Sequence, residues 1–455
     1  MSNATKEDVA RLFGRAAFGA TGADLDTWTG KPYDDVVESL FPPGPPGTPG
    51  RTPQPDEAVR VPLERTTNDV ATAQRWWLNR MRTTPYPIEE RVTLFWHDHF
   101  ATAYTGQPDT GMLMIQNQTL RTHGLGSFRD LANAMLVDPA MLIWLNGIQN
   151  WVNGINENLA REFLELFTLG VVPQVYTETD IRQAAKVLTG WTVNTSTRLA
   201  QLTAARHDNS VKHVLGRTIG GNAAAAPTEY LQLTEAALAH DGGRTAARFL
   251  AYKLVQEFGY VVPLDQVSSD PLVSDVAWAI RANDAWSIGD GVRTLLTHPR
   301  WRYASPDRQY VRSPIELVVH GAKVLGIEIP AANTLQSQAV NAAVARAGQA
   351  PLIPPNVGGW PQGLGWLSQT TTLGRYDLLN TLWLAYRNQQ RQAVAPPPPV
   401  TDLAWWTWWM GLAGLSTSTT LRLQEYLATP GTTVVLDKQA SLFILLGASP
   451  DWQVF

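Results

Sequence analysis

The chain has 455 residues, of which 44% are hydrophobic and 17% are charged, with 36 lysines and arginines against 40 aspartates and glutamates. It contains no cysteine, so disulfides, thiol catalysis and iron–sulfur clusters are excluded. A net charge of −4 without a basic cluster argues against nucleic acid as a partner. No apolar run approaches the 20 residues of a membrane span, so no membrane span is predicted.

The N-terminal part of the chain is predicted to form two helices. Over residues 7–20, apolar side chains recur at i, i+3, i+4 and i+7, and Gly19 follows as a stop. A shorter helix is expected over residues 34–40. Residues 1–8 have neither a basic start nor an apolar stretch, so we expect no secretory leader in this sequence. The expected location is the cytoplasm if this N-terminus is the native one.

Two Pro-rich segments divide the sequence. A Pro/Gly-rich loop over residues 42–64 and a Pro-rich linker over 393–400 cannot hold a helix or a sheet ladder. They separate N-terminal helices at 1–41, a main helical core at 65–392 and a Trp-rich segment at 401–455, all expected to pack together. We therefore predict a mainly α fold, with a single large multi-helix globular unit, a few short strands and Pro-rich loops.

Most of the remaining segments show helical periodicity bounded by capping residues. The clearest of them cover residues 177–190, 229–239, 244–258, 314–325 and 335–347. Strand patterns are short and lie chiefly at 212–215 and 433–436. The four indoles between Trp405 and Trp409 are typical of a helix packed on several sides, with a stacking platform for a sugar as the alternative.

The stretch 156–170 holds the first candidate site. A capping asparagine and a terminal glycine delimit a predicted helix. At 100° per residue, Glu162 falls inside the apolar arc of this helix, while Asn158 and Glu165 follow its edge. Two carboxylates at i and i+3 suit metal ligation or general acid–base catalysis, and the alternative is a buried structural ion pair.

The stretch 87–100 holds the second candidate site, because it contains two of the eight histidines, His97 and His99. In a regular helix these two side chains point about 200° apart, so only His99 faces inward. If the helix frays at Trp96, both imidazoles can converge on one ion. The alternative is that the inward histidine is a hydrogen-bonded core residue.

Two loops add further candidates. His207 and Asp208 precede Lys212 and suit either a further metal ligand and an oriented base or simple turn chemistry. The loop 354–366 is rich in Gly and Pro and contains two tryptophans. Such a loop lowers stability unless its shape is required, so we expect it either to wall a pocket or to plug the core.

Together these stretches resemble a large bacterial family catalogued as domain of unknown function 1800. The similar segments occur in family order at residues 11–19, 95–100, 156–170, 184–191, 207–216, 248–254, 312–316, 354–366 and 449–453. The sequence departs from the family pattern at Asp98, where Asn is usual, and at Ser210 and Gly358. The resemblance covers nearly the whole chain and implies one integrated α-helical unit, without implying a particular reaction.

From the residues we predict that the helix with His99 packs against the helix with Glu162. The leading hypothesis is a metal-dependent enzyme, oxidative or hydrolytic, for a small organic or sugar-like substrate. The candidate catalytic residues are Glu162, Glu165, His99, Arg161 and Lys212. The candidate metal ligands are His97, His99, Glu162, Glu165, His207 and Asp208. The candidate pocket residues are Asn158, Trp96, Trp360 and Trp366. Nitrogen and carboxylate donors suit one divalent iron, manganese or zinc ion.

Two other functions fit the same residues. One is a metal-free enzyme that uses Glu162 as a desolvated acid or base together with His99. The other is a non-enzymatic carbohydrate-binding, partner-binding or assembly protein, in which the buried polar network is structural. No nucleotide or thiol-based cofactor is expected, and the oligomeric state is left open.

Overall fold

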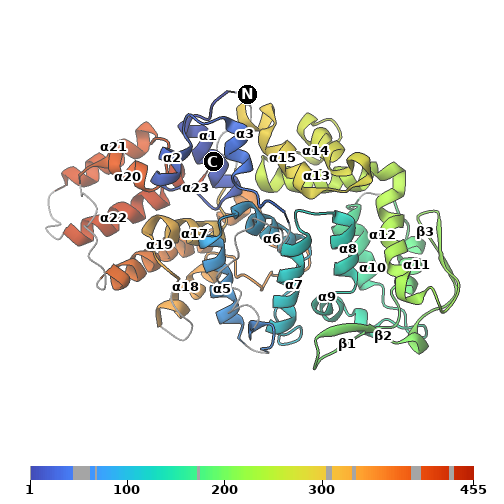
Figure 1. Ribbon diagram of the computed structural model, residues 1–455. Helices are drawn as coiled ribbons and strands as arrows, with labels where there is room; N and C mark the ends of the chain where they lie inside the picture. Colours follow the sequence, from blue (N-terminus) through green and yellow to red (C-terminus); the bar gives the residue numbers. More distant parts are fainter. Residues whose placement is uncertain are drawn as a thin grey trace.

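A computed structural model describes residues 2–44, 62–66, 69–171, 175–303, 310–329, 335–390, 401–429 and 435–454. Within these ranges the chain forms a single globular unit that is mainly α-helical, as predicted. The first and last helices lie beside each other near the middle of the molecule (Figure 1). Each of the described helices is too short or too polar to cross a lipid bilayer.

The helices follow one another in chain order. The first are α1 (Lys6–Ala16), α2 (Gly22–Trp28), α3 (Tyr33–Glu38), α5 (Val70–Thr83), α6 (Pro87–His99), α7 (Thr110–His123), α8 (Phe128–Leu136), α9 (Pro139–Trp144), α10 (Asn158–Glu162) and α11 (Glu178–Val187). Next come α12 (Glu229–Ala239), α13 (Arg244–Phe258), α14 (Pro271–Arg281), α15 (Ile288–Thr297) and α16 (Pro299–Tyr303). The last are α17 (Pro314–Leu325), α18 (Leu335–Arg346), α19 (Gln369–Gln390), α20 (Leu403–Trp409), α21 (Thr417–Ala428), α22 (Val435–Ala448) and α23 (Pro450–Gln453).

Side-chain caps explain why several helices begin where they do. Thr5, Thr21, Thr177 and Ser313 each accept a hydrogen bond from the backbone three residues later, and the acid at that position caps back. This reciprocal arrangement satisfies two backbone donors that the helix itself leaves open. The predicted helices over 229–239, 244–258 and 314–325 have the same bounds as α12, α13 and α17.

The described strands form two small antiparallel sheets. β1 (Trp191–Asn194) pairs with β2 (Leu199–Leu202), and β3 (Val211–Val214) pairs with β4 (Arg217–Gly220). The strand predicted at 212–215 corresponds to β3. The strand predicted at 433–436 is wrong for residues 435 and 436, which begin the apolar helix α22; residues 433 and 434 lie outside the described ranges.

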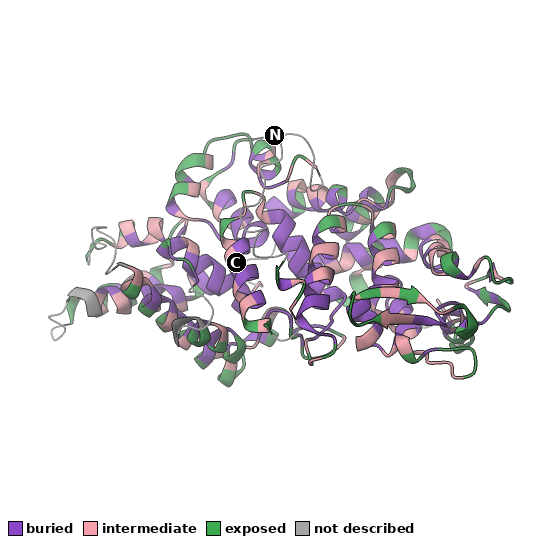
Figure 2. Ribbon diagram, turned by 60° about the horizontal axis from the view of Figure 1, so that its bottom comes forward, coloured by how far each residue is buried: buried purple, intermediate pink, exposed green. Residues whose placement is uncertain are grey.

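Two large hydrophobic clusters make up the core, which runs through the middle of the molecule (Figure 2). The first joins the N-terminal helices to the helices from α8 to α15. The second joins α5 and α7 to the C-terminal helices from α17 onward. Helix α6 contributes to both, with Val92 and Phe95 in the first cluster and Leu94 in the second. It therefore links the two clusters, as α7 and α9 also do.

The Trp-rich C-terminal segment packs on the N-terminal helices. The Trp406 side chain is fully buried, and the Trp408 indole donates a hydrogen bond of 3.0 Å to Asp26 on α2. The predicted linker 393–400 and most of the predicted loop 42–64 lie outside the described ranges. The division into segments 1–41, 65–392 and 401–455 stays a prediction.

Candidate functional site

Helix α6 remains a regular helix through His99, so its two histidines face different surroundings. His97 Nε2 accepts a hydrogen bond of 3.2 Å from the Leu352 backbone N–H. Its ring lies against the indoles of Trp77 and Trp360, with ring centres 5.3 and 5.5 Å away. Burial lowers the pKa of His97 to about 3, so the imidazole is neutral.

His99 occupies an aromatic environment. Its Nε2 lies 3.0 Å from the Phe167 carbonyl oxygen, which can only accept a hydrogen bond, so Nε2 carries the proton. Aromatic rings surround the imidazole: Phe95, Trp96, Phe100, Phe128, Phe167 and Phe249. Burial, assisted by Lys253, lowers the pKa of His99 to about 3. The helix with His99 does contact the segment that follows Glu162, but through a backbone carbonyl.

The segment with Glu162 and Glu165 differs from the predicted helix. Its α-helical part, α10, ends at Glu162, and a π-helix continues over Phe163–Thr168. A π-helix holds more residues per turn, so directions computed at 100° per residue fail there. Glu162 is half-buried rather than part of the core, which corrects its predicted position. Burial and the neighbouring Glu165 raise the pKa of Glu162.

The other residues predicted at this segment face solvent or surface partners. Arg161 forms ion pairs with Glu157 at 3.3 Å, Glu165 at 3.3 Å and Glu178 at 2.8 Å. Asn158 is exposed, so it does not line a pocket with the predicted aromatic residues. Asn158, Glu162 and Glu165 therefore lie on a polar, partly exposed surface of α10 and the π-helix.

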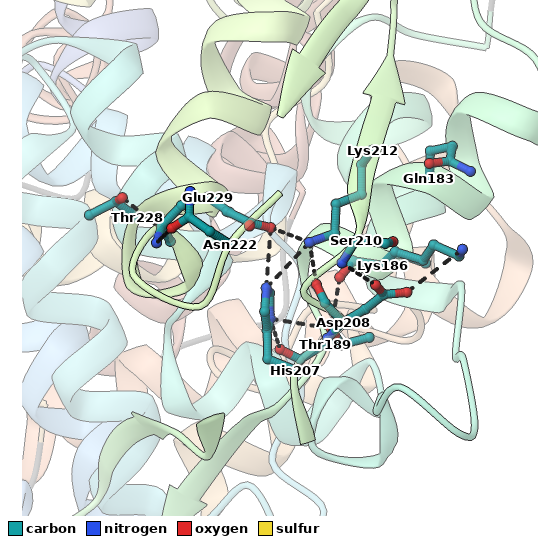
Figure 3. Close-up of polar contacts among 12 residues, drawn as sticks. Gln183, Lys186, Thr189, His207, Asp208, Ser210, Lys212, Asn222, Thr228 and Glu229 are labelled. Atoms are coloured by element: carbon teal, nitrogen blue, oxygen red, sulfur yellow. Dashed lines mark hydrogen bonds and ion pairs between the residues drawn. The ribbon is translucent and has the colours of Figure 1, made fainter. Parts of the chain in front are cut away.

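His207, Lys212 and Glu229 form a second polar cluster, which we call the charged triad (Figure 3). The Lys212 ammonium donates to Glu229 Oε2 at 2.6 Å, to the Asp208 carbonyl oxygen, and to His207 Nε2 at 3.4 Å. His207 Nδ1 in turn lies 2.9 Å from the Thr189 carbonyl oxygen. The three triad side chains have no exposed area, so a ligand cannot reach them.

The six predicted metal ligands lie in separate places. Among the described residues, no group of three or more His, Asp or Glu side chains is arranged to hold a metal ion. The two α6 histidines are hydrogen-bonded to different backbone groups. Glu162 ends α10, Glu165 lies in the π-helix, and His207 belongs to the charged triad. Asp208 instead binds the Ser210 backbone and approaches Lys186 at 3.6 Å. Within the described chain these six residues therefore do not meet at one point, and the metal site stays a prediction.

A cavity of about 350 Å³ opens beside the end of α6. Its wall comes from α6, from the end of α13 and from two loops of the C-terminal half. The lining residues most relevant here are Asp98, Glu257, Tyr310, Gln362, Trp360 and Trp366. The cavity has the size of a small-molecule site, with aromatic walls and a few polar groups. Both predicted loop tryptophans line it, whereas the predicted Trp96 lies in the core and donates to the Gly124 carbonyl at 2.8 Å.

Asp98, between the two histidines, holds the Gly-rich loop against α6. Its Oδ1 accepts a hydrogen bond of 2.7 Å from the Trp360 backbone N–H. At Gly359, with φ of +83°, an added Cβ would lie 2.3 Å from that same Oδ1, so only glycine allows this approach. Burial raises the pKa of Asp98 to about 6, and the Trp360 hydrogen bond opposes this rise.

Glu257 is the second carboxyl group of the cavity. Its Oε1 lies 3.0 Å from Arg91 Nη2, and 15% of its side chain is exposed. Arg91 also binds Glu316 at 3.2 Å and the Tyr310 hydroxyl at 3.2 Å, so its charge is shared among several oxygens. Burial raises the pKa of Glu257 to about 7, against the influence of Arg91. The cavity thus holds a carboxyl group that exchanges its proton near neutral pH.

Asp98, Glu257 and Tyr310 are not among the site residues predicted from the sequence. One signal was available for the two acids: Asp98 lies in the last turn of α6, and Glu257 lies in the last turn of α13. The negative end of the helix dipole disfavours a carboxylate there. An acid in the last turn of a mostly buried helix is therefore a candidate functional residue. No comparable signal marks Tyr310.

Comparison with known proteins agrees with the features that the sequence suggested. No curated protein and no solved structure matches the chain. One family model, described as a protein of unknown function (DUF1800), matches residues 11–454, which is nearly the whole chain. The matched residues include most of both hydrophobic clusters and all the residues that line the cavity. The chain therefore belongs to the DUF1800 family.

Proposed function

We propose that the chain is an enzyme that uses general acid–base catalysis on a small, uncharged polar substrate, such as a sugar, bound in the cavity beside α6. The observation that carries this proposal is the Glu257 carboxyl group, with a pKa of about 7 at the surface of a cavity of about 350 Å³. An acid–base catalyst works best when its pKa lies near the working pH. Perturbed pKa values in clefts are frequent at catalytic sites.

The second carboxyl group complements Glu257. Burial raises the pKa of both carboxyl groups, and the charge of Asp98 raises the pKa of Glu257 further, so an ionised Asp98 favours a protonated Glu257. One group then accepts a proton while the other donates one, which is the division of roles that paired carboxyl groups supply in acid–base enzymes. Arg91 holds Glu257 in position, and the Trp360 backbone holds Asp98.

The walls of the cavity support a sugar-like ligand. Trp360 and Trp366 line it and are themselves largely buried, with 6% and 4% of their surface exposed. Indole faces bind the apolar faces of sugar rings, and their N–H groups remain available for hydroxyls. A ligand without charge avoids repulsion by the ionised Asp98.

The predicted divalent metal remains a proposal without a ligand set in the described ranges. Elemental analysis of protein purified without chelator tests it directly. One equivalent of iron, manganese or zinc that is lost in the double variant His99→Ala/Glu162→Gln would support the original metal site. The acid–base proposal uses only side chains of the chain and does not depend on that result.

The decisive experiment compares two matched variants, Glu257→Gln and Glu162→Gln. Ligands are first identified by calorimetric titration with neutral sugars and polyols, and turnover is then followed by product analysis. We expect Glu257→Gln to lower the rate by about 10²- to 10⁴-fold with similar affinity, because Gln keeps a hydrogen bond to Arg91 but carries no exchangeable carboxyl proton. Glu162→Gln should leave the rate unchanged.

The competing function, a non-enzymatic binding protein, makes a different prediction. It requires that a ligand binds in the same cavity but is recovered unchanged, in both the wild type and Glu257→Gln. Full activity of Glu257→Gln would contradict the acid–base proposal. Loss of activity in Glu162→Gln alone would instead favour the metal-free mechanism first predicted for Glu162 and His99.

A further inference from the structure

A second cavity lies on the C-terminal side of the molecule, and its walls contain one buried cation. It has a volume of about 170 Å³ and is bounded by the start of α19 and by α23. Most of its walls are apolar, and the members are Leu367, Thr372, Arg375, Tyr376, Ala448, Pro450, Gln453 and Val454. None of these lining residues is acidic.

Arg375 is fixed in this cavity by two hydrogen bonds to uncharged acceptors. Its Nε donates to Gln453 Oε1 at 2.6 Å, and its Nη2 donates to the Arg312 carbonyl oxygen at 2.7 Å. The Gln453 amide is itself held by a hydrogen bond of 2.6 Å to the Gly447 carbonyl. Only 3% of the Arg375 surface is exposed. The guanidinium is therefore rigid as well as buried.

The third nitrogen of this guanidinium has no partner. Within the described ranges, Arg375 Nη1 is buried and makes no hydrogen bond, and no carboxylate forms an ion pair with Arg375. Burial lowers the pKa of Arg375 to about 10, opposed only by the charge of Glu316, so the group stays charged at neutral pH. A buried charge without a counter-ion is strongly unfavourable, and an anion that approaches it recovers much of that free energy.

We propose that this cavity binds a small carboxylate with a short apolar tail, whose carboxylate pairs with Arg375. Arginine suits this role because its planar fork matches a carboxylate and stays charged. Thr372 also lines the cavity, and its hydroxyl is a second donor for the carboxylate in this proposal. The tail contacts Leu367, Pro450 and Val454, which bound the remaining space. This site is separate from the cavity with Glu257, and the inference does not rest on the proposed enzymatic function.

Calorimetric titration with butyrate and with butyramide tests the proposal on the full chain. The two ligands have the same shape, but only butyrate carries a charge. We expect one butyrate per chain, no measurable binding of butyramide, and about a fourfold gain in affinity for each methylene from acetate to butyrate. Equal affinities for butyrate and butyramide at matched ionic strength would overturn the proposal.

Variants locate the binding site. Arg375→Met should abolish butyrate binding, and Arg375→Lys should weaken it, because lysine lacks the planar fork. If these variants do not fold, a second pair of variants tests whether butyrate binds in this cavity. Leu367→Trp fills the cavity from a half-exposed position, whereas Leu373→Trp lies on the same segment at 71% exposure and does not line the cavity. Loss of binding in Leu367→Trp but not in Leu373→Trp supports the site, and unchanged binding in both overturns it.

Discussion

The charged triad and the cavity beside α6 both contain buried ionisable side chains, but these side chains differ in their ion pairing and in their exposure to solvent. In the triad, the Lys212 ammonium has three acceptors around it, and no triad side chain is exposed. In the cavity, Glu257 shares one arginine with other oxygens and remains partly exposed. Within the described chain, Glu229 Oε1 is buried without a hydrogen-bond partner, so the triad differs from the cavity in its lack of exposed side chains rather than in complete pairing. A short ion pair that solvent cannot reach stabilises a fold, whereas a shared ion pair at an accessible wall leaves a proton free to move. Burial of a charge alone therefore does not identify a catalytic site.

The largest expected effect tests the triad. Lys212→Met should lower the free energy of unfolding by about 3–5 kcal/mol, because it leaves the Glu229 carboxylate buried without its cation. The double variant Lys212→Met/Glu229→Leu should recover much of this loss, because it removes both charges. Urea denaturation followed by tryptophan fluorescence measures both values.

A half-exposed lysine serves as the control for that prediction. Lys186 approaches Asp208 at 3.6 Å with 30% of its side chain exposed, so Lys186→Met should cost less than about 1 kcal/mol. If Lys212→Met destabilises the protein no more than Lys186→Met, the triad is not a stabilising element and its contrast with the cavity disappears.

The next effect is the pH dependence that Glu257 contributes to stability. The pKa of this group is 4.5 in its unperturbed form and about 7 in the fold. Below pH 4.5 it is protonated in both states. Between pH 4.5 and 7 only the unfolded state is ionised, so stability falls as the pH rises, by roughly 3 kcal/mol in total. Above pH 7 the contribution is constant.

Glu257→Gln should remove this pH-dependent contribution. His97 and His99 have lowered pKa values, so their contribution is present above pH 6.5 and is lost as the pH falls toward 3. It has the opposite slope and is common to both proteins. Urea denaturation at pH 5 and pH 8 therefore isolates Glu257 as the difference between wild type and variant. Parallel pH profiles would show that Glu257 titrates normally.

A smaller effect tests the loop that closes the cavity. Gly359→Ala should cost roughly 2 kcal/mol, because it combines a positive φ with a contact of 2.3 Å to Asp98 Oδ1. Gly363→Ala is the matched control on the same loop. Its φ is +55°, but no atom lies within 4 Å of the added Cβ, so about 1 kcal/mol is expected. Equal losses in thermal or urea unfolding would show that Asp98 does not hold the loop.

The smallest expected change in stability concerns Glu162, the acid that the sequence predicted as a catalytic residue. Glu162→Gln should change stability by no more than about 0.5 kcal/mol, because Glu162 is half-buried and lies beside the like charge of Glu165. Glu165→Gln, which removes one surface ion pair with Arg161, should lie within the same small range. A loss of 3–5 kcal/mol in Glu162→Gln would mean that this carboxylate is buried in an ion pair after all.

The sequence alone predicted a helix correctly where its capping residue, its apolar periodicity and its terminal glycine all agreed. Helix α11 has its capping threonine, its apolar stripe and its terminal glycine within 15 residues, and the structure has that helix. The loop 354–366 was expected to wall a pocket or plug the core, and its residues from Trp360 to Trp366 line the cavity. In both cases the information lies within one short stretch of chain.

The site was not predictable in the same way. Asp98 and Glu257 are 159 positions apart in the sequence, and only the packing of α6 near α13 brings both to one cavity. The π-helix after Glu162 changes the direction of every later side chain, and no residue preference announces it. Periodicity thus placed most of the helices, but it gave no indication that Asp98 and Glu257 share a cavity.

Helix α6 also has a consequence for how the protein folds. Because its side chains complete both hydrophobic clusters, neither half of the molecule has a finished core until this helix is in place. The two halves should therefore unfold in one cooperative transition rather than in two. A fragment that lacks α6 would expose the apolar faces that this helix covers in each cluster. The helix that carries the cavity's Asp98 is thus also one of the elements, together with α7 and α9, that join the two clusters into one cooperative unit.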